Sequence, residues 1–442
     1  MAKAMQRRID LTSIITGVLF GLTCALYIET TNANDWNSVY AIITSISRIC
    51  ALAGAYLALV GLVLVSRIPY IERSVGHDRL VIWHRKLGPW SMYLVSFHVI
   101  FVVLGYAGND QVKLAVEIWR MVKGYPWMLP ALVGFIFFAA AGITSYKRVR
   151  KNFTYETWWT FHLYTYLAIS LAYMHQVLTG PMFINHPLNK AFWELLYIYA
   201  ALLLITWRFI IPTIKSLRHQ LKIEDIVKEA PGIYSVIMRG RKLNSLGARG
   251  GQFFGWRFLA KGHWFISHPY SLSAAPTDHY MRVTVKALGD SSSLIKNIKP
   301  GTRVFFEGPY GTFTASRASR GHITLIGGGV GITPIRALLE EFDITKEIDV
   351  IFRASKAEDI LFRKELDELA RIRGARVHYL IGPRTQHPMN ARYIEKYIPA
   401  FKDSDVYVCG PTPLVDAVRE AAQSVGIPKN RFHDEAFEFH NV

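Results

Sequence analysis

Long apolar runs fill the first half of the chain, and they constrain its fold more than any other feature. Six runs before about residue 215 are each long enough to cross roughly 30 Å of hydrocarbon as a helix. They cover residues 9–28, 40–65, 83–106, 127–146, 158–178 and 192–211. Only 19% of all residues are charged and 51% are hydrophobic, which argues against a disordered chain. We therefore predict an α-helical membrane bundle of six transmembrane helices, followed by a soluble part.

Alternate connections between the apolar runs are rich in basic residues, and this asymmetry predicts the orientation in the membrane. The basic residues around the second and fourth connections are Arg67, Arg73, Arg79, Arg85, Lys86, Lys147, Arg148, Arg150 and Lys151. The positive-inside rule then puts the N-terminus, these two connections and everything after residue 212 in the cytoplasm. Basic loops and nucleotide phosphates account for the net charge of +18, and no motif supports binding to nucleic acid.

Four histidines lie inside the predicted membrane helices, where an imidazole is costly unless it is paired or ligated. His84 and His98 are 14 residues apart in the third run, and His162 and His175 are 13 apart in the fifth. Both helices run outward, so each depth holds one histidine from each helix. Neutral imidazoles are common metal ligands, and the two matched pairs predict two haems stacked across the bilayer. Four ordinary packed histidines are the alternative.

The two intervals differ in what they imply for the helices. Fourteen residues is about four turns, so His84 and His98 share a face and differ in depth by about 21 Å. Thirteen residues falls about 140° short of four turns, so the second pair needs local overwinding or a twist between the haems. Arg48 lies near the depth of the outer pair. It is expected to partner a haem propionate or to lie beside the electron acceptor, with a snorkelling arginine as the alternative.

From about residue 217 the pattern becomes that of a soluble α/β protein. Residues 223–227, 234–239 and 281–288 are expected strands, and a break at Gly289-Asp290 leads into a short helix at 291–294, which together predict a small antiparallel barrel. A buried strand at 323–326, a glycine loop and a helix at 335–342 then begin a Rossmann-like domain, with later strands at 348–353, 377–381 and 406–408. The predicted domains are therefore residues 1–214, 215–316 and 317–442.

Two motifs of the α/β part predict nucleotide binding. The glycine loop stands between a strand and a helix, where its backbone can approach phosphate and the helix N-terminus supplies free N–H groups. Its residues are Gly327, Gly328, Gly329, Gly331, Thr333 and Pro334. Cys409, Gly410 and Pro411 follow a later strand, at the sheet edge where open α/β sheets bind ligands. A small buried apolar residue is the alternative for Cys409. No CxxC pair exists, which excludes iron–sulfur clusters and zinc ribbons.

On these residues the chain resembles the ferric-reductase-like transmembrane flavocytochromes, which include the phagocyte-type NADPH oxidases. The resemblance runs from about residue 40 to the end, and the histidine intervals of 14 and 13 match the family's haem ligands. It implies a ferredoxin-reductase-like module that binds FAD through His268, Pro269, Tyr270 and Ser271 at the flavin, and Lys286, Gly289, Ser291 and Ser292 at the pyrophosphate. It also implies a linking turn at Gly308-Pro309-Tyr310-Gly311, Cys409-Gly410-Pro411 beside the nicotinamide, and Phe437 over the flavin.

The residues after the second nucleotide strand favour NADPH over NADH. Arg353, Ser355 and Lys356 stand there without an acidic residue at the strand end. A 2′-phosphate needs cationic and hydroxyl partners, whereas a ribose 2′-hydroxyl needs a carboxylate. A solvated loop charge is the alternative for Lys356.

The resemblance implies a multi-pass protein of the plasma membrane, the inner membrane in a bacterium, that passes electrons from cytosolic NADPH through FAD and two b-type haems. The acceptor would be oxygen, giving superoxide, or a ferric chelate. The alternative is a membrane electron-transfer subunit that reduces a dedicated extracytoplasmic protein partner. Two features bear on the acceptor: Val102 stands where the oxidases often have a further histidine, and Arg48 resembles a family arginine near the outer haem.

Overall fold

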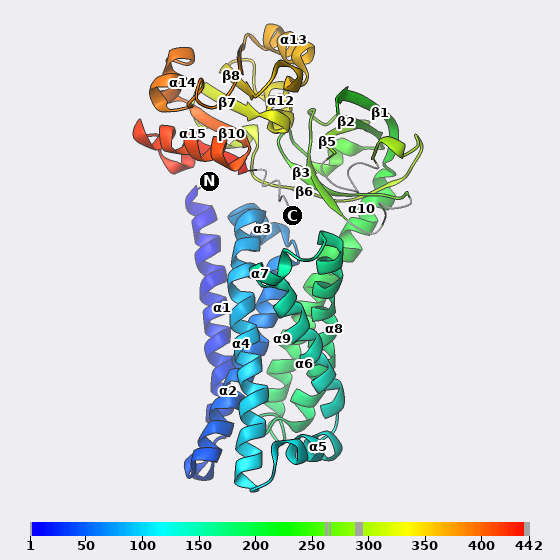
Figure 1. Cartoon of the computed structure of the whole chain (residues 1–442), viewed down its shortest axis with the longest axis vertical. Helices are drawn as coiled ribbons and strands as arrows, with labels where there is room; N and C mark the ends of the chain where they lie inside the picture. Colours follow the sequence, from blue (N-terminus) through cyan, green and yellow to red (C-terminus); the bar gives the residue numbers. More distant parts are fainter. Residues whose placement is uncertain (1, 261–263, 265–266, 288–294, 437–442) are drawn as a thin grey trace. The chain divides into compact units, whose positions relative to one another are not determined.

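The computed structural model describes residues 2–260, 264, 267–287 and 295–436 (Figure 1). The chain forms two compact units, which divide between Phe209 and Ile210. The first unit is helical and contains the apolar half of the sequence. The second is built from strands and helices and contains the predicted flavin and nucleotide motifs.

The long helices of the first unit match the predicted apolar runs. They are α1 (Ala2–Thr30), α2 (Val39–Val65), α4 (His77–Asn109), α6 (Met128–Ser145), α8 (Tyr155–Thr179) and α9 (Pro187–Ile205). The last continues through a π-helical turn, Thr206–Ile210, into α10 (Ile211–His219). Shorter helices are α3 (Pro69–Val75), α5 (Leu114–Gly124) and α7 (Lys147–Arg150).

Length and composition support five of the six predicted membrane spans. Within the described residues, five helices are long and apolar enough to cross a membrane: residues 7–30, 39–65, 79–109, 128–145 and 187–219. The predicted fifth run forms a helix, α8, of 25 residues, but it is not among the five candidates. Its many tryptophans, tyrosines and histidines make it less apolar than the other helices. The aromatic and histidine content that suggests a site in α8 is therefore the same content that weakens its membrane signal.

Helices of the first unit pack in two close pairs, α2 along α4 and α6 along α8. Small residues allow this approach, as is usual where helices meet in a membrane. A side chain at Gly54 of α2 would press on Val95 of α4, and one at Gly134 of α6 would press on the Ala168 carbonyl of α8. These two pairs contain all four histidines of interest, two on α4 and two on α8.

The second unit begins with two three-stranded antiparallel sheets, which confirms the predicted antiparallel β domain. One has the order β1 (Lys222–Ala230), β2 (Ile233–Arg239), β5 (Tyr280–Lys286), and the other β4 (His268–Ser271), β3 (Phe253–Phe258), β6 (Val304–Tyr310). Single bridges, Lys222 to Arg303 and Leu272 to Val283, connect the two sheets. Phe254, Trp256 and Phe306 fill the core between them.

The remaining strands form one parallel sheet in the order β11-β10-β7-β8-β9, which confirms the Rossmann-like prediction. Its strands are β7 (His322–Gly328), β8 (Glu347–Ala354), β9 (Arg376–Ile381), β10 (Asp405–Gly410) and β11 (Phe432–Ala436). The helices are α12 (Ile332–Glu341), α13 (Arg363–Arg373), α14 (Ala391–Tyr397) and α15 (Thr412–Ser424). The strand order reverses direction between β7 and β10, where sheets of this kind bind their ligands.

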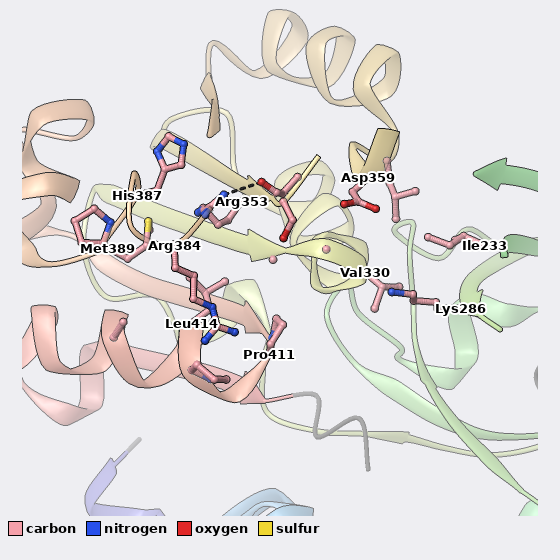
Figure 2. A pocket seen from close by; sticks show the side chains of 18 residues that line it. Ile233, Lys286, Val330, Arg353, Asp359, Arg384, His387, Met389, Pro411 and Leu414 are labelled. Carbon is pink, nitrogen blue, oxygen red and sulfur yellow. Dashed lines mark hydrogen bonds between the residues drawn. The ribbon is translucent and has the colours of Figure 1, made fainter. Parts of the chain in front are cut away.

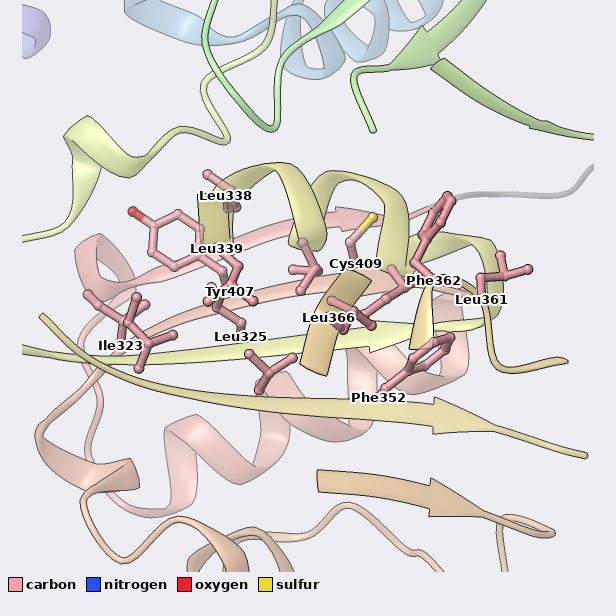
Figure 3. Packing of buried hydrophobic residues seen from close by; sticks show 14 of the residues in the cluster. Ile323, Leu325, Leu338, Leu339, Phe352, Leu361, Phe362, Leu366, Tyr407 and Cys409 are labelled. Atoms are coloured by element: carbon pink, nitrogen blue, oxygen red, sulfur yellow. The ribbon is translucent and has the colours of Figure 1, made fainter. Parts of the chain in front are cut away.

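Both faces of this sheet are covered, because successive residues of each strand enter opposite cores. Leu325 packs in a cluster with residues of α12, including Leu338 (Figure 3), and its neighbour Ile326 packs in a cluster with Val415 of α15. Strands buried on both faces are continuous apolar runs in the sequence, as β7 is. Helix α12 begins at Ile332, three residues before the predicted start, because Pro334 is tolerated in a first helical turn.

A cluster of ions joins the antiparallel sheet to the helices of the parallel one. Arg282 of β5 donates two hydrogen bonds to the carboxylate of Glu365 on α13, at 2.9 and 2.8 Å, and Arg336 of α12 donates a third at 2.9 Å. Burial raises the pKa of Glu365, but these two guanidinium groups outweigh burial and hold the pKa below its usual range. This ion cluster ties the β1-β2-β5 sheet to helices α12 and α13 of the parallel sheet.

Candidate functional site

The predicted histidine pairs lie together in the first unit. The rings of His84 on α4 and His162 on α8 have centroids 5.9 Å apart and planes at 82°. His98 and His175 lie close enough to interact electrostatically. Two imidazoles that share one metal at about 2 Å each have ring centroids about 6 Å apart. The separation of the His84 and His162 rings therefore fits a single metal between them.

A ladder of hydrogen bonds holds the histidines of α4 against α2. Its three bonds are His84 Nδ1 to Gly61 O (3.1 Å), Ser91 Oγ to Gly54 O (2.7 Å) and His98 Nδ1 to Ser47 O (3.1 Å). The partners recur every seven residues on both helices. Seven residues is about two turns, so each helix presents one face to the other. The ladder thus fixes the register of α2 against α4 and the depth of both histidines.

The same bonds determine which ring nitrogen is available to a ligand. A backbone carbonyl only accepts hydrogen bonds, so Nδ1 of His84 and of His98 must carry the proton. The lone pair of each ring is then on Nε2. Metal-binding histidines usually bond their second nitrogen to a carbonyl or carboxylate in this way. The donor set therefore fits bis-imidazole ligation of haem iron.

Arg48 lies in a polar cluster at one end of α2. Its guanidinium donates to the hydroxyl of Tyr106 at 2.8 Å and of Tyr27 at 3.3 Å, and lies 4.0 Å from the carboxylate of Asp35. It also lies within electrostatic reach of His98. A simple snorkelling arginine would extend into water, whereas this side chain is only 19% exposed. Arg48 is therefore a fixed cation near the His98 pair.

The predicted flavin motif forms strand β4, paired with β3 through Phe253 and Ser271. The rings of His268 and Tyr270 stack in parallel, with centroids 6.0 Å apart, and Trp256 Nε1 donates to the Tyr270 carbonyl at 3.0 Å. Pro269 is exposed and Ser271 is buried. Burial raises the pKa of the Tyr270 hydroxyl, which stays neutral. The motif thus presents two stacked aromatic rings, a surface against which a flavin ring would pack.

Several predicted cofactor residues lie outside the described part of the chain. These are Gly289, Ser291, Ser292 and Phe437. Their roles stay predictions. Strand β11 ends at Ala436, which pairs with Gly410 of β10, so the sequence preceding Phe437 lies beside the Cys409-Gly410-Pro411 motif.

The glycine loop connects β7 to α12 at the predicted place. Gly329 has φ +56, a conformation that favours glycine, and a side chain at Gly331 would collide with the Cys409 carbonyl. Cys409 pairs with Gly327 in the parallel register, so both nucleotide motifs lie at one sheet edge. Thr333 and Pro334 are buried in the first turn of α12 and shape the loop from within. The helix N-terminus gives this edge a positive potential.

A cavity of about 270 Å³ opens at this edge (Figure 2). Backbone atoms of the glycine loop line it, together with Pro411 and Leu414 beyond β10. Three further segments supply polar and charged side chains. They are Lys286 of β5, then Arg353, Ser355 and Asp359 at and after the end of β8, and Arg384 and His387 after β9. In Figure 2, Arg384 and His387 lie on the left of the cavity, and Asp359 and Lys286 lie on the right. The cavity can therefore hold an anion at the end that carries Arg384.

The structure changes the roles expected of Arg353 and Lys356. Arg353 donates to the carbonyls of Ala354, Leu380 and Gly382 at 2.7, 2.8 and 2.7 Å, so it mainly supports the cavity wall. The pKa of Arg353 is lowered, and burial is the main cause. Lys356 does not line the cavity; its ammonium lies 3.3 Å from Glu358. Because Lys286 faces this cavity, its assignment to the FAD pyrophosphate stays a prediction.

Cys409 is fully buried in the core beside α12 (Figure 3). Burial, and then the nearby carboxylates of Glu435 and Asp434, raises the pKa of its thiol well above the ordinary value. The side chain therefore acts as a small apolar residue in this structure. Its backbone, together with Gly410 and Pro411, forms the β10 side of the nucleotide edge.

Two family models match the chain. The ferric reductase like transmembrane component covers residues 50–173, and the oxidoreductase NAD-binding domain covers residues 325–420. The first range includes His84, His98 and His162, and the second includes the glycine loop and Cys409. The chain thus combines a segment similar to the ferric-reductase-like transmembrane component with a later segment similar to oxidoreductase NAD-binding domains. This combination is consistent with the resemblance to the ferric-reductase-like flavocytochromes.

Curated relatives match the chain over part of its length. It is 30% identical over 190 residues to the glycine betaine monooxygenase reductase subunit of Pseudomonas aeruginosa, covering 39% of this chain and 51% of that one. It is 31% identical over 183 residues to NADH-cytochrome b5 reductase 1 of Aspergillus terreus, covering 36% and 62%. The chain thus spans about half the length of the first of these relatives. Among solved structures, the FAD/NAD binding domain of nitric oxide dioxygenase from Vibrio cholerae is 20% identical, with a TM-score of 0.41, covering 50% and 99%.

Sequence reasoning missed Arg384, His387 and Ser91. Arg384 and His387 follow β9, far from the motifs in sequence, and no local pattern marks them as part of the cavity. Ser91 stands midway between His84 and His98, and its seven-residue spacing from both was a signal that could have revealed the ladder.

Proposed function

We propose that this protein transfers electrons from NADPH, through FAD and two b-type haems, to an acceptor on the opposite side of the membrane. The observation that carries the proposal is the pairing of His84 with His162 and of His98 with His175, in one chain with a reductase module. When bound, FAD and the haems would convert hydride from NADPH into single electrons and conduct them across the bilayer. The N-terminus and the reductase module would lie in the cytoplasm, as the basic loops predict.

The four histidines would hold both irons from two sides. With Nδ1 of His84 and His98 bonded to carbonyls, Nε2 is the nitrogen directed to the metal. Haems held by two imidazoles each would supply electron transfer without binding the acceptor at the metal. Arg48, held by Tyr106 and Tyr27, would supply a positive charge near the His98 pair that attracts an anionic acceptor or stabilises a reduced anionic product.

The charged end of the nucleotide cavity supports NADPH as the electron donor. Arg384 and His387 line that end, and Ser355 adds a hydroxyl group. Guanidinium groups bind phosphate through paired, charge-assisted hydrogen bonds. Asp359 lies on the opposite side of the cavity in Figure 2. We therefore assign the 2′-phosphate to Arg384, with Ser355 in the lining of the same cavity and Arg353 supporting the cavity wall.

The acceptor is oxygen or a ferric chelate, with a dedicated protein partner as the alternative. The experiment is NADPH-driven reduction of external cytochrome c by the detergent-solubilised full-length protein supplied with FAD and haem, with and without superoxide dismutase. Loss of the signal with dismutase identifies oxygen as the acceptor. A signal that dismutase leaves unchanged shows direct electron transfer, and ferric chelates and protein acceptors are then compared. Protein that binds FAD but no haem would refute the proposed function.

A further inference from the structure

Ser145, the last residue of α6, contacts two aromatic side chains of α8. Its hydroxyl accepts a hydrogen bond from Trp158 Nε1 at 3.0 Å and lies 3.4 Å from His162 Nδ1. It also donates to the carbonyl of Ala141, one turn back along α6, at 2.7 Å. Ser145 is therefore the hydrogen-bond partner of one histidine of the inner pair, in a position where His84 and His98 have backbone carbonyls.

Counting the protons on this oxygen assigns the direction of each bond. A serine hydroxyl has one proton and two lone pairs. The contact with Ala141 O is the shorter, at 2.7 Å against 3.4 Å to His162 Nδ1, so we assign the hydroxyl proton to Ala141 O. Both lone pairs then accept, one from Trp158 Nε1–H and the other from His162 Nδ1–H, and Nε2 is the nitrogen that would ligate a metal. The tautomer of His162 is thereby the same as that of His84.

Trp158 also contacts His162 directly. The two rings stack, with centroids 5.2 Å apart and planes at 26°, and the guanidinium of Arg150 lies 4.6 Å from the centroid of the Trp158 ring. The stacked Trp158 ring restricts rotation of the His162 imidazole about its Cβ–Cγ bond. Trp158 thus has two effects: it orients His162, and its N–H competes with the His162 N–H for the oxygen of Ser145.

We propose that Ser145 is a positioning residue for the inner haem and that it adjusts the reduction potential of that haem through His162. This inference rests on the proposed function, because it assumes that His84 and His162 ligate an iron. A hydrogen bond from Nδ1–H makes an imidazole a stronger electron donor to its metal. Stronger donation stabilises ferric over ferrous iron and lowers the potential. The Ser145 oxygen accepts from both Trp158 and His162. Its hydrogen bond with His162 is therefore weaker than a bond to an oxygen that accepts from His162 alone.

Two substitutions should move the inner potential in opposite directions. Ser145→Ala removes the acceptor from His162, so the inner haem becomes easier to reduce. We expect a change of up to tenfold in its ferric-to-ferrous ratio at fixed solution potential, which is about 59 mV for one electron. Trp158→Phe keeps an aromatic ring for stacking but removes the competing N–H. The bond from His162 to Ser145 then strengthens and the inner potential falls.

The measurement is an optical redox titration of the purified, haem-loaded full-length protein. His84→Ala identifies which of the two titration steps belongs to the inner haem, and the outer haem serves as the internal reference. Ser145→Thr retains the hydroxyl and should keep the wild-type inner potential. Thr144→Ala is the matched control, because the Thr144 hydroxyl donates to the carbonyls of Ala140 and Ala141. It should leave both potentials unchanged.

The outcomes separate this inference from the proposed function. Opposite shifts in Ser145→Ala and Trp158→Phe, confined to the inner haem, support it, and so does loss of the inner haem from Ser145→Ala but not from Ser145→Thr. Unchanged potentials with both haems bound, or shifts in the same direction, overturn the role of Ser145 and leave the proposed function standing. Wild-type protein that binds no haem overturns the proposed function and this inference with it.

Discussion

Replacing Arg384 with alanine tests the assignment of the nucleotide cavity. The guanidinium of Arg384 lies at the end of the cavity where His387 also lies, and the cavity edge receives the N-terminus of α12. NADPH and NADH differ only in the 2′-phosphate. If Arg384 binds that phosphate, the Arg384→Ala variant should bind NADPH more weakly and bind NADH as the wild type does.

The magnitude follows from the exposure of the side chain. A hydrogen bond to a charged group contributes about 1.5–3 kcal/mol where it is shielded from water. Arg384 is exposed, so solvent screening reduces this to about 1–2 kcal/mol. That range corresponds to a rise in the KM for NADPH of about 5- to 30-fold. Arg353 would not compensate, because three backbone carbonyls already bind its guanidinium.

The assay is steady-state oxidation of NADPH and of NADH by the full-length protein with an artificial acceptor. Inhibition by 2′-AMP and by AMP gives an independent measure of phosphate binding. Arg371→Ala is the matched control, since Arg371 is an exposed arginine of the same domain that pairs with Glu368 on α13. Equal increases in KM for both nucleotides, or no change in either, would refute the assignment.

Three further predictions concern the haem site, the ion cluster and the buried thiol. His84→Ala and His162→Ala should each reduce the haem content from two to one per chain, and two haems in either variant would contradict the pairing. Glu365→Gln should lower the free energy of unfolding at pH 7 by about 1–2 kcal/mol, since it leaves Arg282 without its carboxylate and Arg336 with Glu340 alone. Because the pKa of Glu365 is lowered by folding, its stabilisation is present above the ordinary carboxyl pKa and is lost as the pH falls through the folded value. The difference between wild type and variant in pH-dependent unfolding should therefore vanish in acid, and a constant difference would contradict the cluster. Cys409, whose pKa is raised by burial, should resist alkylation at neutral pH in the native protein and react after unfolding, which mass spectrometry measures.

The fold was accessible from the sequence where local pattern determines it. Continuous apolar strands and a glycine loop before a helix predicted the parallel sheet, and β7, β8 and β10 appear at the expected residues. The membrane half was predicted less completely. Hydropathy supports five spans, and α8 is found as a helix whose aromatic residues face other side chains such as His162 and Phe137.

The site depends on hydrogen-bond partners that no sequence pattern identifies. The spacing of the histidines predicted the pairs, but their hydrogen-bond partners are carbonyls of α2, which no sequence pattern identifies. Likewise Arg353 was expected to contact phosphate, and the structure shows its donors bound to three carbonyls of its own sheet edge. Backbone acceptors are common to every residue, so only the packed structure reveals which of them a side chain reaches.

By itself the sequence determined the elements of this protein: the apolar helices, the two kinds of sheet, and the residue types suited to haem, flavin and nucleotide. These depend on periodicity and composition within short segments. The tertiary structure decided the register of α2 against α4, the contact of Ser145 with His162, and the placement of Arg384 and the glycine loop around one cavity. Each joins residues that are separated by at least 17 positions, and such contacts depend on which faces pack together. Helix packing and strand order fix those faces, and neither is encoded in any single segment.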